Sequence, residues 1–331
     1  MNTVPWRLLR FAIGLAVTTL FTYLVLRHVT PRELVTAAAQ VHWIALIVSL
    51  AFLVVEYGLR AVRWWLMLRS RVPNIPLRTC VWPIVVSVAV NNVVPLRIGD
   101  AFRVIGFRDQ LKAPAVHLLG TLIIERLLDM TVLSVFFLAG LANIGDTDAP
   151  PLYGKIAVFL CSGVLACWIV VLTAGQWLQK LVASVCGSRL LNALGWNLAA
   201  ERRVLEFTTA LALIRLPRRA LQLMVISAFL WTCNGAIFSA VAEGLGYDGA
   251  FLGPWFSFAM ATLSTLLPSS PGHVGAFDYF AVSGLMAYSA RRAMATLFAL
   301  LVHAVLWLPT TAAGMTYLFT RGAKIRRLVS T

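Results

Sequence analysis

Charged side chains occur inside stretches of this chain that are otherwise apolar. The densest group is Glu125-Arg126-Leu127-Leu128-Asp129. On a helix Glu125 and Asp129 lie one turn apart on one face, and Arg126 can pair with Asp129 at i, i+3. Two interpretations are open, namely a direct role in handling a substrate or proton, or an ion-pair lock to a basic residue of another helix: Arg60, Arg63 or Arg97.

A second polar cluster runs from Asn91 to Arg103 and contains Asn91, Asn92, Pro95, Arg97, Gly99, Asp100 and Arg103. The two asparagines can bond backbone groups that Pro95 leaves free. Asp100 suits the start of a helix, where unpaired N–H groups carry partial positive charge. A guanidinium beside the N-terminal end of a helix is well placed to bind a phosphate. The alternative is that Asp100 only caps the helix and neutralises Arg103.

A third cluster repeats part of this pattern, because Pro95-Leu96-Arg97-Ile98-Gly99 returns as Pro271-Gly272-His273-Val274-Gly275. The flanking residues that we include in the candidate site are Pro268, Ser269, Ser270 and Asp278. The serines offer hydroxyl donors, and His273 can titrate near neutral pH, although a histidine in a turn is more often only hydrogen-bonded. His303 falls near the repeat position of Glu125 and could be its partner.

The elements that carry these residues belong to a membrane protein. The chain is 60% hydrophobic and 12% charged, and its mean hydropathy is +0.83, which excludes a soluble globular domain. The net charge of +15 falls in short clusters at the ends of apolar segments, which favours anionic lipid over nucleic acid as the partner. The five cysteines have no CxxC spacing, so neither disulfides nor a metal site are predicted.

A membrane helix needs about 20 apolar residues, and we predict six full spans: Leu8 to Leu26, Trp43 to Leu66, Ala115 to Leu141, Ile156 to Leu172, Leu221 to Val241 and Thr296 to Phe319. The first has no small-x-small cleavage site, so it is expected to remain as a helix. Proline and glycine interrupt two further stretches, Cys80 to Phe107 and Phe251 to Tyr288, which we predict to be re-entrant hairpins. Irregular backbone at membrane depth must be buried or line a wet cavity.

Basic residues set the expected orientation, since Lys and Arg favour short cytoplasmic connections. Placing both termini in the cytoplasm leaves only the Arg291-Arg292 pair in a poor position. A full span from Gly275 to Ser289 would accommodate that pair, but it would put the basic C-terminus outside. We therefore rank this alternative second.

The favoured order of span, span, hairpin, span occurs twice, in half-repeats of about 1–145 and 155–320 within one integral membrane domain, 1–331. Each half has an odd number of full spans, so the halves must be inverted, as in alternating-access transporters. Between the halves, 176–218 is expected to form an interfacial elbow. Its parts are an amphipathic helix at Trp177 to Val185 and another at Asn197 to Leu216.

No soluble-enzyme motif is predicted to be functional. Gly244-Leu245-Gly246-Tyr247-Asp248-Gly249 matches GxGxxG, but it follows an apolar helix and has no strand before it. No Walker A run, HExxH motif or catalytic triad pattern is present. We therefore expect no cofactor, no metal and no enzymatic activity of a soluble type.

At these motifs the chain resembles the flippase-like integral membrane family that includes the transmembrane region of lysylphosphatidylglycerol synthase. The resemblance covers about Trp6 to Phe319. The residues that match are Asn92, Pro95, Arg97, Gly99 and Arg103, then Glu125, Arg126 and Asp129, then Pro268, Pro271, Gly272, Gly275 and Asp278. Asp100 and Asp278 stand where glutamate is expected, and His273 where glycine is usual, which puts headgroup specificity in doubt.

The resemblance implies a lipid flippase of the cytoplasmic membrane, acting on a lipid with an anionic or zwitterionic headgroup. It also implies a stand-alone form, because only Arg321 to Thr331 follows the last span where bifunctional relatives carry an aminoacyl transferase domain. A separate lipid-modifying enzyme is then a possible partner. The alternative function is an accessory subunit or enzyme of hopanoid, glycolipid or aminoacyl-lipid synthesis.

Overall fold

The fold is given by a computed structural model that describes residues 16, 18–25, 27, 30–39, 41–94, 97–144, 151–186, 196–266 and 271–329. These residues form helices joined by turns, with no strand among them. The predicted all-α class is confirmed. Most of the predicted first span, Leu8 to Leu26, lies outside the described residues.

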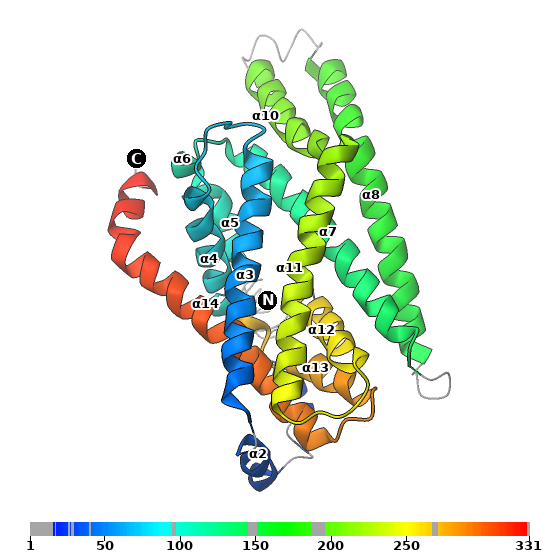
Figure 1. The fold of residues 1–331 in the computed structure, drawn as a ribbon. Coiled ribbons are helices and arrows are strands. Elements are labelled where there is room, and N and C mark those ends of the chain that lie inside the picture. The colour runs from blue at the N-terminus through cyan, green and yellow to red at the C-terminus, as the bar shows by residue number, and fades with distance from the viewer. Residues whose placement is uncertain are drawn as a thin grey trace, which may run out of the picture.

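Long helices form the frame of the molecule: α3 (Trp43–Leu68), α7 (Ala115–Leu141), α8 (Pro151–Cys186), α11 (Pro217–Gly244) and α14 (Arg292–Val329). Figure 1 shows α3 and α11 upright and close together, with α14 crossing behind them. In the described part of the chain, four helical segments are long and apolar enough to cross a membrane: Trp43–Leu68, Leu152–Thr173, Pro217–Gly244 and Arg292–Arg321. Each contains a predicted span, and α7 has the predicted bounds.

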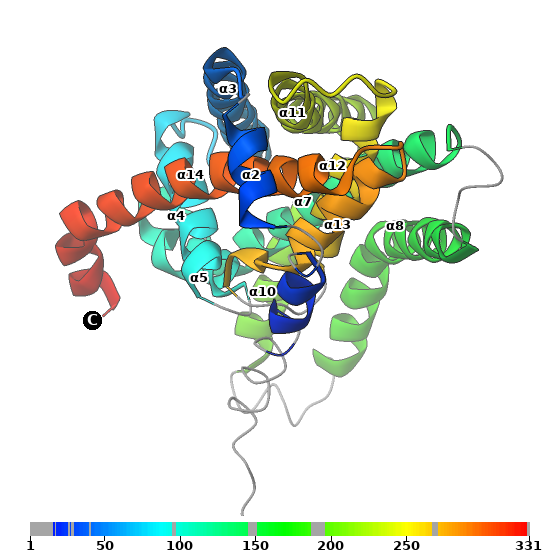
Figure 2. The same ribbon diagram turned by 90° about the horizontal axis from the view of Figure 1, so that it is seen from below.

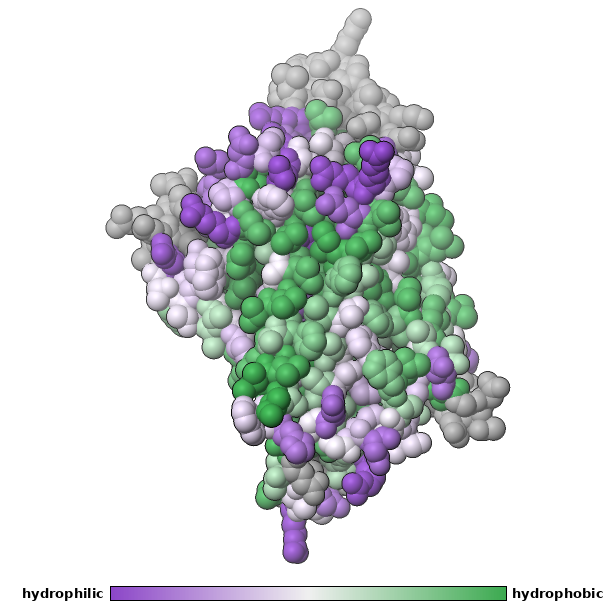
Figure 3. All heavy atoms as spheres, viewed as in Figure 1, coloured by the Kyte–Doolittle hydropathy of each residue, from purple (hydrophilic) through white to green (hydrophobic). Residues whose placement is uncertain are grey.

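The outer surface fits a bilayer. On the face drawn in Figure 3, apolar residues form a broad belt across the middle of the molecule, and hydrophilic residues gather toward its two ends. Large apolar side chains of α3 and α8 face outward, including Val54 on α3 and Phe159 on α8. In water such a surface would be a liability, whereas in lipid it is the expected exterior.

Both predicted hairpins are broken helices. The first consists of α4 (Arg78–Val93) and α5 (Ile98–Gly106), and the second of α12 (Leu252–Ser264), the short 3-10 turn η2 (Pro271–His273) and α13 (Ala276–Met286). In each hairpin the two helices pack against each other. The structure therefore has two helix pairs where a sequence read only by hydropathy would give two long spans.

The short length of α13 decides between the two topologies. Its 11 residues extend about 16 Å, whereas the hydrocarbon core is about 30 Å thick. A full span from Gly275 to Ser289 is therefore excluded. Turns at Ala287 to Ser289 separate α13 from α14.

The breaks have identifiable backbone causes. Val94 is extended, as expected for a residue before proline, and Arg97 adopts a left-handed conformation immediately before α5. In the second hairpin Gly272 (φ 69°) and Gly275 (φ 87°) have positive φ angles, where glycine avoids the cost of a Cβ. The predicted turn residues Pro95 and Pro268 lie outside the described residues.

Contacts between the two halves are reciprocal. Helix α3 packs on α11, α4 packs on α14, and α12 packs on α7. Each hairpin thus rests on a long helix of the other half, and Figure 2 shows α13 beside one part of α14 while α4 lies by another. This pattern is the one expected of an inverted repeat, which stays a prediction.

The predicted elbow has a different structure. No helix break follows Leu172, because α8 continues to Cys186, so residues 177–185 extend a long helix instead of forming a separate interfacial one. The next predicted helix is present as α10 (Trp196–Leu211) and the turn η1 (Ala212–Arg215). Helix α8 packs against α10, which gives both helices a tertiary partner that local amphipathicity does not reveal.

An ion pair holds α10 to the turn after α3. The guanidinium of Arg71 donates two hydrogen bonds of 2.9 Å to the carboxylate of Glu206. These bonds, together with the charge of Arg71, hold the pKa of Glu206 below its usual value. Two shorter helices, α2 (Pro31–Ala38) and α6 (Arg108–Leu111), lie at opposite ends of the molecule (Figure 1).

Candidate functional site

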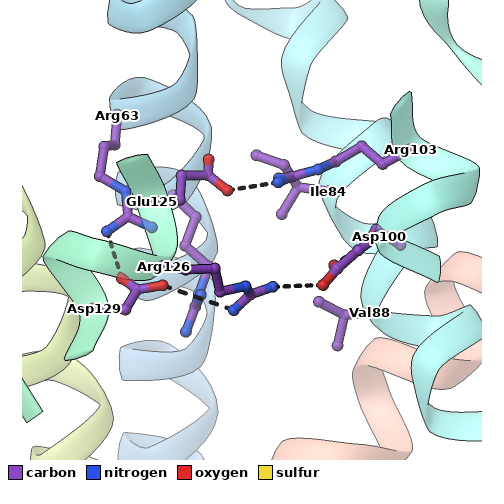
Figure 4. Close-up of a pocket in the computed structure, with 10 residues that line it drawn as sticks. Arg63, Ile84, Val88, Asp100, Arg103, Glu125, Arg126 and Asp129 are labelled. Carbon is purple, nitrogen blue, oxygen red and sulfur yellow. Dashed lines mark hydrogen bonds and ion pairs between the residues drawn. The ribbon is translucent and has the colours of Figure 1, made fainter. Parts of the chain in front are cut away.

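A small cavity of about 30 Å³ lies among α3, the first hairpin and α7. Figure 4 shows its charged lining converging from these elements. The lining residues are Arg60, Arg63, Ile84, Ser87, Val88, Asp100, Arg103, Glu125, Arg126 and Asp129. This volume is enough for water but too small for a lipid headgroup, so the cavity is closed to any large ligand.

The deepest ion pair joins Arg63 of α3 to Asp129 of α7. Their N–O distance is 2.6 Å, and each side chain is only 2% exposed. Helix α11 completes the pair, because Ser227 accepts a hydrogen bond from Arg63 and the indole N–H of Trp231 donates to Asp129. The pair links three helices and has the geometry of the predicted interhelical lock.

A second buried pair joins α5 to α7. Arg103 donates to Glu125 at 2.5 Å, and both side chains are almost fully buried. The Arg103 guanidinium also lies over the ring of Trp64, 4.6 Å from its centroid, a cation–π arrangement that is favourable where water is excluded. The alternative that Asp100 neutralises Arg103 does not describe the pairing found, because Glu125 on the neighbouring helix forms that ion pair.

Asp100 pairs with Arg126 instead, at 2.9 Å. Ser87 and Asn91 of α4 also donate to the same carboxylate. The predicted pairing of Arg126 with Asp129 is longer, at 3.8 Å. Arg126 is the most accessible cation in the cavity lining, since 40% of its side chain is exposed and the side chains of Arg60, Arg63 and Arg103 are 18% or less.

The fourth pair, Glu56 and Arg60, lies within α3 with an N–O distance of 2.6 Å. Snorkelling to the membrane interface does not explain it, because Glu56 is buried and accepts a 2.7 Å hydrogen bond from Asn234 of α11. Arg60 lies over the ring of Trp231. With this pair, four arginines and four carboxylates neutralise one another in and beside the cavity.

The remaining residues of the first cluster join the hairpins. Asn91 accepts a 2.7 Å hydrogen bond from the Gly99 amide, so it caps α5 as predicted for a residue near the broken backbone. Asn92 donates to Thr311 of α14. Arg97 does not line the cavity, because its guanidinium donates to the carbonyl and hydroxyl oxygens of Thr265 at the end of α12.

The second cluster forms its own polar site beside the tip of its hairpin. Asp278 accepts a hydrogen bond from the Gly275 amide and pairs with His303 at 2.7 Å. The prediction that His303 faces Glu125 is therefore wrong. His273 lies in the turn η2 and does not line the cavity. Ser269 and Ser270 lie outside the described residues.

Sequence reasoning missed the polar groups that complete these pairs. Ser87, Ser227, Asn234 and Thr265 are isolated in apolar or turn sequence, and nothing nearby marks them. Trp231 resembles any aromatic residue in a span. In the described residues, no group of three or more histidine, cysteine or acidic side chains could hold a metal ion.

The helical fold, the apolar belt and the buried charge network define a polytopic α-helical membrane protein with two broken hairpins. The family model described as the lysylphosphatidylglycerol synthase TM region matches residues 11–314. The chain belongs to this family, which makes it a membrane protein related to lipid metabolism or transport. No curated protein and no solved structure matches the chain.

Proposed function

We propose that this protein moves a lipid with an anionic or zwitterionic headgroup across the membrane, through the space between the two hairpins. The single observation that carries the proposal is the accessible Arg126 beside a network of buried arginines. Family membership supports a lipid as the cargo. Localisation to the cytoplasmic membrane with both termini inside is part of the same proposal.

Arg126 is suited to receive a phosphate because only one of its carboxylate contacts is short. Asp100 occupies one guanidinium nitrogen at 2.9 Å, and Asp129 is 3.8 Å from another. A guanidinium has five N–H donors, so a phosphate can form a bidentate pair with Arg126 by displacing Asp100. Ser87 and Asn91 then keep Asp100 hydrogen-bonded, which lowers the cost of the exchange.

Binding requires the cavity to open, since its present volume admits only water. The pairs of Arg63 and Arg103 are buried and act as the fixed frame. Movement of the α5 end that carries Asp100 would separate this residue from Arg126 and enlarge the cavity. Broken helices at the midplane are suited to such movement, because their ends are not held by a continuous helical backbone.

The test is translocation of a fluorescent phospholipid in proteoliposomes, followed by quenching of the probe in the outer leaflet. Arg126→Gln is expected to lower the translocation rate by about tenfold or more, because a charge-assisted contact contributes about 1.5–3 kcal/mol. Arg108→Gln is the matched control, because Arg108 is exposed and, among the described residues, forms an ion pair only with the adjacent Asp109. Equal rates for wild type and Arg126→Gln would contradict the proposal.

A second readout separates this function from an accessory or enzymatic one. The purified protein is incubated with the same lipid and the products are analysed by mass spectrometry. A translocator leaves the lipid chemically unchanged. Covalent conversion of the lipid without translocation would favour the alternative of an enzyme in lipid synthesis.

A further inference from the structure

The Asp278–His303 pair has a hydrogen-bond pattern that specifies its proton content. His303 Nδ1 lies 2.7 Å from a carboxylate oxygen of Asp278, and His303 Nε2 lies 3.1 Å from the carbonyl oxygen of Gly272. The other carboxylate oxygen of Asp278 accepts from the Gly275 amide. Both ring nitrogens therefore face oxygen atoms.

A neutral imidazole has one N–H donor and one acceptor nitrogen. With Asp278 ionised, a neutral His303 would direct a lone pair at an oxygen on one side. The pattern is satisfied when the pair holds one additional proton, either as an imidazolium beside a carboxylate or as an imidazole beside a carboxylic acid. Both arrangements have no net charge, which suits a pair whose side chains are 15% and 7% exposed.

The same pair holds the tip of the second hairpin. Asp278 lies in α13, Gly272 lies in the turn η2, and His303 lies in α14, so the extra proton joins three segments. Gly272 is packed tightly, because a Cβ added there would lie 2.5 Å from Trp307 Nε1 and 3.2 Å from the Asn92 carbonyl oxygen. Asn92 belongs to the first hairpin, next to the residue that caps α5.

A second donor is close to the Gly272 backbone. The Nε1 atom of Trp307 is buried and has no hydrogen-bond partner among the described residues, although it lies one turn from His303 on the same helix and against Gly272. A buried N–H without a partner is unfavourable. Loss of the His303 bond to Gly272 would leave room for the turn to move toward this donor.

Few other ionisable groups among the described residues face His303. His273 of η2 interacts electrostatically with both His303 and Arg97. Helices α4 and α3 contribute Asn92 and Tyr57, which contact Thr311 and Thr310 two turns away. No charged side chain of the described parts of α2 or α11 forms an ion pair with α14.

The corresponding position in the first half has a permanent charge. Arg103 and Glu125 tie the second helix of that hairpin to the following long helix, as Asp278 and His303 do in the second half. Arginine stays protonated in proteins, whereas histidine changes charge near neutral pH. One half is therefore fixed in charge, and the other can respond to protons.

We propose that the Asp278–His303 pair is the binding site for a proton that is transported together with the lipid. The proton holds the second hairpin to α14 and against the first hairpin, and its release frees the hairpin tip to move. This inference rests on the proposed function. A proton gradient would then drive the movement of the lipid.

The first test measures lipid transport driven by a pH gradient across the membrane of proteoliposomes. The membrane potential is clamped, and the substrate is a zwitterionic fluorescent lipid with no net charge. One proton per lipid predicts that a gradient of one pH unit shifts the ratio of lipid between leaflets by up to about tenfold. His303→Gln and Asp278→Asn should both abolish this shift. His42→Gln, at an exposed position outside the pair, should retain it, and so should His273→Asn.

The second test follows the hairpin tips without any lipid movement. Spin labels at Val93 and Val274, which are exposed at the two tips, report their separation in a cysteine-free background between about pH 5 and about pH 9. The separation should increase as the pH rises through the transition. In folded His303→Gln protein it should not depend on pH.

The outcomes distinguish the two proposals. Lipid movement that ignores the pH gradient, together with a tip separation that is independent of pH, would overturn the proton site and leave the lipid function standing. A His303-dependent change in separation without lipid movement in any condition would support the proton site and reject the lipid function. Loss of the pH response in His273→Asn alone would assign the proton to the other histidine and refute the proposal.

Discussion

Each arginine that borders the cavity faces a carboxylate, and the four pairs differ in burial. Arg63 and Asp129 are sealed among three helices, whereas Arg126 extends from α7 with 40% of its side chain exposed. Burial of a charge is tolerated only when a partner and hydrogen bonds replace water. The sealed pairs are therefore structural, and the accessible one has the freedom to exchange partners.

Arg63→Met should destabilise the protein by about 3–5 kcal/mol, because it leaves Asp129 charged and buried without its cation. Arg126→Gln should cost about 1 kcal/mol or less, since water can solvate the exposed end of that pair. Thermal unfolding of purified protein in detergent measures both. The double variant Arg63→Met with Asp129→Leu should recover part of the loss. Equal stability of the two single variants would contradict the distinction.

At the scale of elements, the hairpins depend on close approach of two helix backbones. Gly99 is buried in α5, where an added Cβ would overlap the carbonyl oxygen of Ser87 in α4 and lie 2.7 Å from Asn91 Oδ1. That contact brings Asn91 to the Gly99 amide and Asp100 to its two donors on α4. Glycine at this position sets the spacing of the first hairpin.

Gly99→Ala should destabilise the protein by about 1–3 kcal/mol, because the backbone of α4 must move to admit the methyl group. Gly58→Ala is the control, since Gly58 is also helical and has nothing within 4 Å of the added Cβ. That change should be neutral or stabilising by up to about 1 kcal/mol. Unfolding midpoints of the two variants, measured side by side, test the prediction, and a harmless Gly99→Ala would refute the tight packing.

At the scale of the whole molecule, the fold places two sets of turns at opposite ends of an apolar belt. The turn after α3 and the C-terminal end of α14 lie at one end, and the turns after α11 and α13 lie at the other (Figure 1). Arg69, Arg71 and Arg321 belong to the first end. Basic residues near membrane helices favour the cytoplasm, so we propose that this end faces the cytoplasm.

Ser70→Cys and Asp248→Cys test this orientation, because both positions are exposed and lie at opposite ends. In a background without native cysteines, an impermeant maleimide added to intact cells should label Asp248→Cys. Ser70→Cys should react only after the membrane is permeabilised. The reverse labelling pattern would show that the membrane orientation is opposite to the one proposed.

The sequence by itself determined the helical class, the long helices other than the N-terminal one, and the two breaks, because these features depend on local composition. Apolar length defines a span, and clustered proline and glycine residues favour an interruption, whereas the single prolines Pro83 and Pro309 lie inside α4 and α14. The choice of Glu125, Arg126 and Asp129 as inward-facing residues also follows locally, since three charges in one turn are too costly to face lipid.

Only the tertiary structure decided which charge meets which. Asp100 lies three residues from Arg103 in the chain, yet it pairs with Arg126, and His303 meets Asp278 instead of Glu125. The continuation of α8 to Cys186 and the contact between α8 and α10 were likewise seen only in the tertiary structure. Charge pairing depends on distances between helices that are far apart in sequence, and periodicity contains no information about those distances.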